Sequence, residues 1–218
     1  MIFPKLGILG FAVIALSGCV FTPHYATGRT LLPMKTELII GVDNLAIASS
    51  DSGEIGVMPA VLPQVGLNLG LPGRFEVGAN GYMSGIFEGK LRWQVNPRSY
   101  EKFDFSLDGT YGLIGDGFTY IKYGSTISKT FDDITPYFYY ERIDNLSGFN
   151  EDDDQDIFDD IIEGVVEELS DASSNVGVGI EIATKGKTAI IPEIQYQFYQ
   201  DSLDLGFFTF GFCIKTKF

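Results

Sequence analysis

The chain contains a single histidine, His24, and this residue decides how much catalysis the sequence can support. Histidine-dependent enzymes built on β-barrels need the imidazole beside a nucleophile or a water molecule. His24 precedes every strand that the pattern described below predicts, so we expect it to be a linker residue. The sequence therefore predicts no enzyme, and no set of residues in it points to a cofactor.

Metal-ligating side chains are most concentrated in an acidic segment from Glu151 to Asp171, which has eleven Asp and Glu residues and no Lys or Arg. Several of them occupy the ligand positions of an EF-hand-like calcium loop. These are Asp152, Asp154, Asp156, Asp160 and Glu163. However, Ile157 stands where such a loop needs glycine for its sharp turn. We therefore treat these carboxylates only as a weak candidate surface for divalent cations.

The same segment fits an amphipathic helix at about 156–169. Its apolar residues recur at the spacing of one helical face. They are Ile157, Phe158, Ile161, Ile162, Val165, Val166 and Leu169. Acidic residues ahead of a helix stabilise its N-terminus. A helix and a calcium loop cannot use these residues together, and we favour the helix. This helix would cover one end of a barrel or bind a partner. Alternatively, the segment is a solvated acidic loop.

Two carboxylates in the strand pattern, Glu76 and Glu88, raise the possibility of paired acid–base chemistry. Cationic residues at the same parity, Arg74, Lys90 and Arg92, offer a simpler explanation. Charges of both signs inside a narrow barrel pair with one another, because an isolated charge out of water is costly. We therefore expect Glu76 and Glu88 to be structural partners of these cations.

The net charge of the chain is −14, and the acidic segment carries most of it. Nucleic-acid binding requires clustered Lys and Arg, which the chain lacks, so we expect no nucleic-acid partner. No stretch after the leader resembles a helix that spans a membrane.

Residues 1–18 have the layout of a secretory signal. Lys5 follows the amino terminus, and an apolar run from Leu6 to Leu16 comes next. The run is too short to span a bilayer as a mature helix. We therefore expect the leader to be removed after export.

The leader ends in Leu16-Ser17-Gly18-Cys19, which resembles the bacterial lipobox. This resemblance implies that Cys19 is lipidated, with palmitate among its acyl chains, and becomes the mature N-terminus. Val20 in place of Asp implies sorting to the outer membrane. Residues 20–34 would then be a tether. Alternatively, secretion is ordinary and Cys19 is incidental. The other cysteine, Cys213, has no local feature that marks it as reactive.

From Thr36 onward the dominant signal is alternation of apolar and polar residues with period two, interrupted by turn residues. Ten such segments predict strands of the length that crosses a bilayer when tilted. They lie at 36–48, 60–70, 74–83, 86–95, 103–113, 118–130, 134–144, 174–183, 187–199 and 206–218.

The predicted connections alternate in length. If the first strand starts in the periplasm, short turns fall inside, at 71–73, 96–102, 132–133 and 184–187. Outside fall 49–59, 84–85, 114–117, 145–173 and 200–205, which include the two longest. Short periplasmic turns and longer outer loops are typical of outer-membrane barrels. This places the acidic segment outside the cell.

The last strand places aromatic residues on one face and ends the chain on Phe218. It resembles the C-terminal signal of outer-membrane barrels, a terminal aromatic strand that the assembly machinery recognises. The alternative is any amphipathic strand that happens to end in Phe.

Alternation alone does not tell whether the apolar face meets lipid or a dry interior. A soluble lipid-carrying barrel has the same period with its apolar face inward. We favour a spanning barrel because the polar face is rich in Gly, Asn and Gln rather than in Lys and Glu. Aromatic residues near strand ends would form interfacial girdles. These are Phe75, Trp93, Phe103, Tyr137, Phe198 and Phe208.

The sequence thus predicts an all-β fold, a single antiparallel up-and-down β-barrel of about ten strands, with one short acidic helix in the loop 145–173. The expected organisation is a signal peptide (1–18), a lipidated tether (19–34) and a barrel (35–218). The expected function is that of an outer-membrane lipoprotein with a structural or surface-interaction role. Its partners would be outer-membrane lipid and the barrel-assembly and lipoprotein-sorting machineries. The alternatives are a lipid-anchored soluble barrel that binds an apolar ligand, and a narrow pore.

Overall fold

The computed structural model describes residues 24–49, 55–56, 61–83, 85–97, 102–114, 118–147, 173–184, 186–199 and 205–218. The acidic segment and Cys19 lie outside these residues, as do the candidate cation ligands and the predicted helix. No helix in the described part of the chain is long and apolar enough to cross a membrane.

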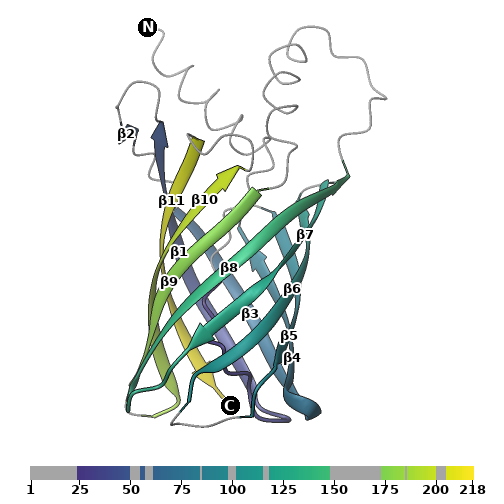
Figure 1. The fold of residues 1–218 in the computed structure, drawn as a ribbon, viewed down its shortest axis with the longest axis vertical. Coiled ribbons are helices and arrows are strands. Elements are labelled where there is room, and N and C mark those ends of the chain that lie inside the picture. Colours follow the sequence, from purple (N-terminus) through teal and green to yellow (C-terminus); the bar gives the residue numbers. More distant parts are fainter. Residues whose placement is uncertain are drawn as a thin grey trace, which may run out of the picture.

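The fold is a closed antiparallel β-barrel of ten long strands (Figure 1). Each strand pairs with its neighbours in chain order, and β11 closes the barrel on β1, with Glu37 opposite Lys217. The long strands are β1 (Thr36–Ser49), β3 (Val61–Leu71), β4 (Phe75–Tyr82), β5 (Ile86–Gln94), β6 (Asp104–Ile114), β7 (Phe118–Ser128), β8 (Ile134–Ser147), β9 (Ser173–Ala183), β10 (Thr188–Tyr199) and β11 (Leu205–Lys217).

All ten predicted strands are confirmed, with bounds that shift by a few residues. Two small elements were not predicted. The two-residue strand β2 (Ile55–Gly56) pairs with β1, and the 3₁₀ turn η1 (Pro72–Arg74) joins β3 to β4. Gly73 in that turn has φ +75°, a conformation that glycine adopts without steric cost.

The two ends of the barrel differ in their connections. At one end, which we name the turn end, lie η1 and the connections 95–103, 129–133 and 184–187, beside the C-terminus (Figure 1). At the other, the loop end, lie the strand ends that flank the connections 50–60, 83–85, 115–117, 148–172 and 200–204. The two longest connections therefore share the loop end.

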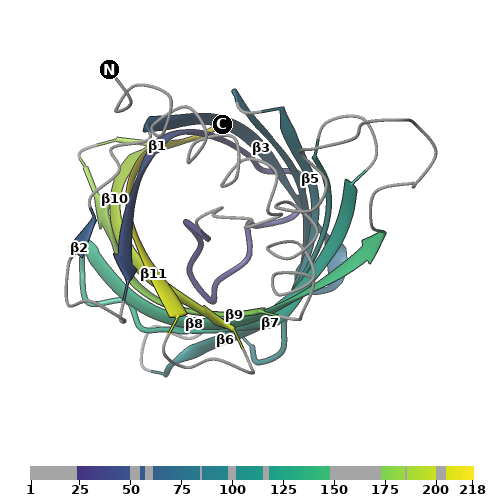
Figure 2. The same ribbon diagram turned by 90° about the horizontal axis from the view of Figure 1, so that it is seen from above.

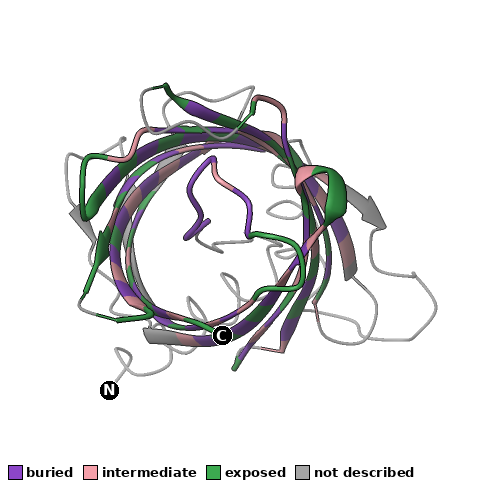
Figure 3. Cartoon of the chain, turned by 90° about the horizontal axis from the view of Figure 1, so that it is seen from below, coloured by how far each residue is buried: buried purple, intermediate pink, exposed green. Residues whose placement is uncertain are grey.

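The polar face of the strands points inward and the apolar face points outward. On β5, Leu91 is 52% exposed on the outside, whereas the next residue, Arg92, is buried in the lumen. The alternation of exposed and buried residues continues around the wall (Figure 3). This orientation is the one expected of a barrel surrounded by lipid.

Aromatic side chains gather on the outer surface near the turn end. Phe75 and Trp93 stack there, with ring centroids 6.1 Å apart, and Phe103 and Phe131 are exposed. The prediction that Tyr137 belongs to such a girdle is wrong. Tyr137 has the parity of the lumen and is buried inside it, because its neighbours Pro136 and Phe138 take the outer face.

The segment before β1 lies inside the barrel (Figure 2). The sequence pattern suggested a tether for these residues, yet most of residues 24–31 are buried by the wall (Figure 3). We name residues 24–34 the luminal segment.

Candidate functional site: the luminal segment and its binding wall

One carboxylate binds the luminal segment at the part that lies nearest the loop end. Glu193 on β10 accepts hydrogen bonds from the backbone N–H groups of His24 and Tyr25, each at 2.8 Å. Two tyrosines from β8, Tyr137 and Tyr139, donate their hydroxyls to the same carboxylate. Glu193 therefore serves as a clamp, which two tyrosines of β8 hold in place from across β9.

Other wall side chains bind the backbone further along the segment. Ser128 Oγ accepts from the N–H of Gly28 at 3.0 Å. Gln94 Oε1 accepts from the N–H of Thr30 at 3.3 Å, and Glu76 Oε2 from that of Leu31 at 2.8 Å. A buried N–H without a partner is costly, so these side chains stabilise the segment in the lumen.

The segment leaves the lumen by pairing with the end of β3. The N–H of Met34 donates to the carbonyl of Gly70 at 2.8 Å, and the N–H of Gly70 donates to the carbonyl of Lys35 at 2.9 Å. Contact here is close: a Cβ added to Gly70 would lie 2.2 Å from the carbonyl oxygen of Leu32. Glycine is required at this point because any larger residue would displace the segment.

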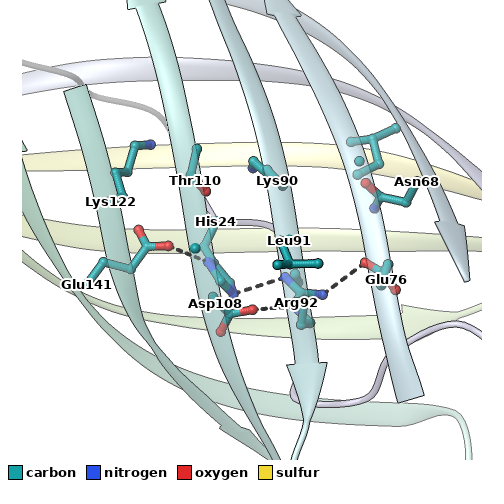
Figure 4. A pocket seen from close by; sticks show the side chains of 14 residues that line it. His24, Asn68, Glu76, Lys90, Leu91, Arg92, Asp108, Thr110, Lys122 and Glu141 are labelled. Carbon is teal, nitrogen blue, oxygen red and sulfur yellow. Dashed lines mark hydrogen bonds and ion pairs between the residues drawn. The ribbon is translucent and has the colours of Figure 1, made fainter. Parts of the chain in front are cut away.

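His24 lies at the upper end of the described segment, in a polar cluster (Figure 4). Its Nδ1 is 2.9 Å from Glu141 Oε1, and its Nε2 is 2.8 Å from Thr126 Oγ1. The imidazole also stacks on Tyr139, with centroids 4.6 Å apart. The expectation that His24 is a linker residue is therefore wrong. Period-two alternation gives no information about a segment that crosses the lumen without pairing as a strand.

The order Glu141–His24–Thr126 is that of an acid, an imidazole and a hydroxyl, the arrangement of a hydrolytic triad. Catalysis would also need room for a substrate at the hydroxyl. Thr126 is fully buried, and its hydroxyl also donates to Asp108 at 2.9 Å. The cavity beside His24 has a volume of only about 20 Å³, room for little more than a water molecule. The cluster thus fits a role in holding the segment rather than in hydrolysis.

Several charges of the lumen form ion pairs. Arg92 bridges Asp108 and Glu76, the latter at 3.3 Å (Figure 4). Glu88 receives Lys122 at 2.6 Å and Lys90 at 3.5 Å. The prediction that Glu76 and Glu88 are structural partners of Arg92 and Lys90 is confirmed, whereas Arg74 lies in the η1 turn. Pairing of this kind offsets the cost of burying charge.

The other sequence candidates add no site here. Cys213 is buried on the luminal face, in contact with a cluster that includes Tyr25, Ile39 and Ile191. Among the described residues, no three His, Cys, Asp or Glu side chains are placed to hold a metal ion.

A closed antiparallel barrel with an apolar outside and a charged, filled inside has the architecture of membrane-spanning β-barrels. No protein-family model matches the chain, and no curated protein matches it either.

One of three similar solved structures has a TM-score above 0.5. An outer membrane channel from Pseudomonas putida F1 is similar with a TM-score of 0.51 and 9% sequence identity, over 90% of this chain and 100% of that chain. The N-terminal β-barrel domain of Pseudomonas aeruginosa OprF gives a TM-score of 0.38 at 9% identity, over 85% of this chain and 98% of that chain. Ail, the attachment invasion locus protein of Yersinia pestis, gives 0.39 at 10% identity, over 86% and 100%. At 9% identity the likeness to the channel shows the fold alone, and the two TM-scores below 0.5 are too low to show even that.

Proposed function

We propose that the protein is an outer-membrane lipoprotein whose β-barrel spans the bilayer, is closed by its own luminal segment, and serves a structural or surface-interaction role. The observation that carries this proposal is the direction of the two faces. Leu91, Phe138, Ile180 and Phe210 are each exposed by about two fifths or more on the outside, while charged residues fill the inside.

A soluble barrel that carries an apolar ligand would need the reverse arrangement. Its interior would be apolar and its exterior hydrated. The described lumen instead holds Arg92, Lys122 and Glu193, all nearly inaccessible to solvent. In water, the exposed apolar belt would drive aggregation, since soluble proteins rarely expose apolar patches of this extent.

A pore is not supported for this state of the protein. The luminal segment crosses the turn-end half, and the space beside His24 amounts to about 20 Å³. A wider cavity of about 500 Å³ opens at the turn end, lined by Arg29, Lys35 and Lys217 among others. Within the described part of the lumen, this cavity ends at the side chains packed around His24. No hydrated solute fits between them.

Three sequence features support the outer membrane as the location. The leader and the lipobox at Cys19 direct export and lipidation in bacteria. In β11, Phe208, Phe210 and Phe212 are exposed on the outer face, as in the assembly strands that this segment resembles. Acylation of Cys19 would give the barrel a second attachment to the membrane.

A closed barrel whose wall is joined to a luminal segment by hydrogen bonds is a rigid support for its loops. Under this proposal, the barrel holds the acidic loop-end connection 148–172 at the cell surface. Its partners are outer-membrane lipid, the two export machineries, and whatever binds that surface.

The test is electrophoresis of unboiled samples combined with extraction of membranes. We expect the protein to migrate differently before and after boiling, and to resist carbonate and urea. Metabolic labelling with a palmitate analogue should mark the native protein and not Cys19→Ala. Release by carbonate without heat-modifiability would refute the spanning barrel, and equal labelling of both proteins would refute lipidation.

A further inference from the structure

The luminal wall carries a second set of buried polar side chains, between His24 and the loop end. Asn175 on β9 has no hydrogen-bond partner for either amide atom among the described residues. The same holds for Gln195 Nε2, Gln197 Oε1 and Thr209 Oγ1. All four side chains are at least 98% buried. Buried polar atoms of this kind nearly always have partners in folded proteins, so these atoms point to a ligand.

These four residues form one patch, which we name the upper amide patch. Gln197 lies opposite Asn175 in the pairing of β9 and β10, and Gln195 lies opposite Thr209 in the pairing of β10 and β11. Two of them are fixed by their other amide atom. Gln195 accepts from the hydroxyl of Tyr139 at 2.7 Å, and Gln197 donates to Ser173 at 3.0 Å. The free donor and acceptor therefore have set positions.

The turn-end half of the lumen shows what such groups bind. There Gln94, Ser128 and Glu193 receive the backbone of the luminal segment. On β10, Glu193 holds the backbone of His24 and Tyr25, and Gln195 and Gln197 follow on the same face toward the loop end. Members of both sets therefore follow one another along β10, so an extended chain bound by Glu193 can continue onto Gln195 and Gln197.

The direction of the segment agrees with this path. Followed backward in sequence, the segment runs from the turn end beside Gly70 to the middle of the barrel at His24. A chain that turned back at His24 would have to pass beside itself. The cavity there, between His24 and the wall at Asn68 and Glu76, is about 20 Å³, and no second strand fits in that space.

We propose that residues 19–23 continue through the loop-end half of the lumen, bound by the upper amide patch, and place acylated Cys19 in the leaflet at the loop end. This inference rests on the proposed function, because it takes Cys19 to be lipidated and the barrel to span. Cys19 is five residues from His24, which extends to about 17 Å at most. The apolar band of such barrels is about 25 Å tall, so this reach carries Cys19 from mid-barrel to the interface.

With the loop end outside the cell, the consequence is a lipid anchor in the outer leaflet rather than in the periplasmic one. The mature N-terminus would then run through its own barrel, and the segment could not be withdrawn without unfolding the wall contacts that hold it.

Disulfide trapping in intact cells tests this path. In a Cys213→Ser background, Thr22→Cys is combined with Gln195→Cys, and in a matched control with Glu181→Cys. Glu181 also faces the lumen but lines the turn-end cavity. We expect a reductant-sensitive internal cross-link for the Gln195 pair in most molecules, and none for the Glu181 pair. Lack of the Gln195 cross-link, with or without the Glu181 cross-link, overturns the proposal.

A second measurement separates this inference from the proposed function. An epitope tag inserted after Val20 should bind antibody on intact cells, in protein that is heat-modifiable and carries the palmitate label. If such protein shows the tag only after the outer membrane is permeabilised, the path through the lumen is wrong while the spanning lipoprotein stands. If heat-modifiability or the label is missing, the proposed function itself fails.

Discussion

The two faces of the barrel wall differ in what they contact and in how specific that contact is. The outer face offers apolar side chains such as Leu91, Leu107 and Phe138 to lipid, which accepts any apolar surface. The inner face offers individually placed groups to one peptide segment. At Glu193, each carboxylate oxygen receives a particular backbone N–H. Many substitutions should be tolerated outside provided they stay apolar, and few inside.

The largest effect should follow from removing a central luminal charge. Arg92→Leu would leave the carboxylates of Asp108 and Glu76 buried without their cation. Loss of one partner of a buried pair costs about 3–5 kcal/mol. We expect a correspondingly lower free energy of unfolding, measured by urea titration of the refolded barrel.

The matched control for that change is Lys90→Leu, on the same strand and the same face. Glu88 would keep Lys122, which is closer to it at 2.6 Å. We expect a much smaller loss of stability. Equal losses for Arg92→Leu and Lys90→Leu would mean that luminal charge in general, and not the Arg92 bridge, stabilises the barrel.

The next effect concerns the outer face. Leu91→Arg would place a charge against hydrocarbon, at a cost of about 2–4 kcal/mol near the middle of the bilayer. We expect poor assembly, seen as loss of the heat-modifiable form, while Leu91→Phe assembles normally. Normal assembly of Leu91→Arg would contradict the assignment of this face to lipid.

Much of the wall could be predicted from the sequence, because a single physical rule governs it. Leu91 and Arg92 are adjacent and must point to opposite faces of a strand, so alternation predicted the strands and placed Glu76, Glu88, Lys90 and Arg92 on one face. Tyr137 was misassigned because an aromatic ring near a strand end suits either a girdle or a luminal hydrogen bond.

The occupant of the lumen could not be predicted in the same way. His24, Gly28 and Thr30 are spaced with no period, and their partners Glu141, Ser128 and Gln94 lie far away in the chain. The lumen of a narrow barrel must be filled, and the segment before β1 is the one described part of the chain left to fill it.

A smaller effect should come from loosening the clamp. Glu193→Gln would replace a charged acceptor of the His24 and Tyr25 N–H groups by an amide. Hydrogen bonds to a charged group contribute about 1.5–3 kcal/mol each, and the amide would keep part of that. We expect faster hydrogen exchange at these two amides in a barrel that still assembles.

Glu181→Gln serves as the comparison, since Glu181 is luminal but pairs with Lys215 and Lys217. We expect Glu181→Gln to leave hydrogen exchange at the backbone amides of His24 and Tyr25 unaltered. If both variants accelerate that exchange alike, the segment responds to luminal charge as a whole and Glu193 is no clamp.

The smallest effect on barrel assembly should come from deleting most of the acidic connection, although this deletion removes more residues than any other change. β8 is the seventh long strand, so it ends at the barrel end opposite to the start of β1, and the connection 148–172 begins there. Charged residues cannot lie in hydrocarbon, which leaves a surface loop as their place in a spanning barrel.

Deleting 151–171 and closing the gap with a short linker should therefore preserve heat-modifiability, because loop closure depends only weakly on length, by about 0.6 kcal/mol per doubling. In the full chain, an epitope tag after Asn150 should bind antibody on intact cells. Since the loop end would then face outward, this result also fixes the leaflet that the luminal segment approaches. A tag that stays protected until the outer membrane is permeabilised would reverse the orientation. The short turns would then face the medium, and an anchor that leaves at the loop end would lie in the periplasmic leaflet.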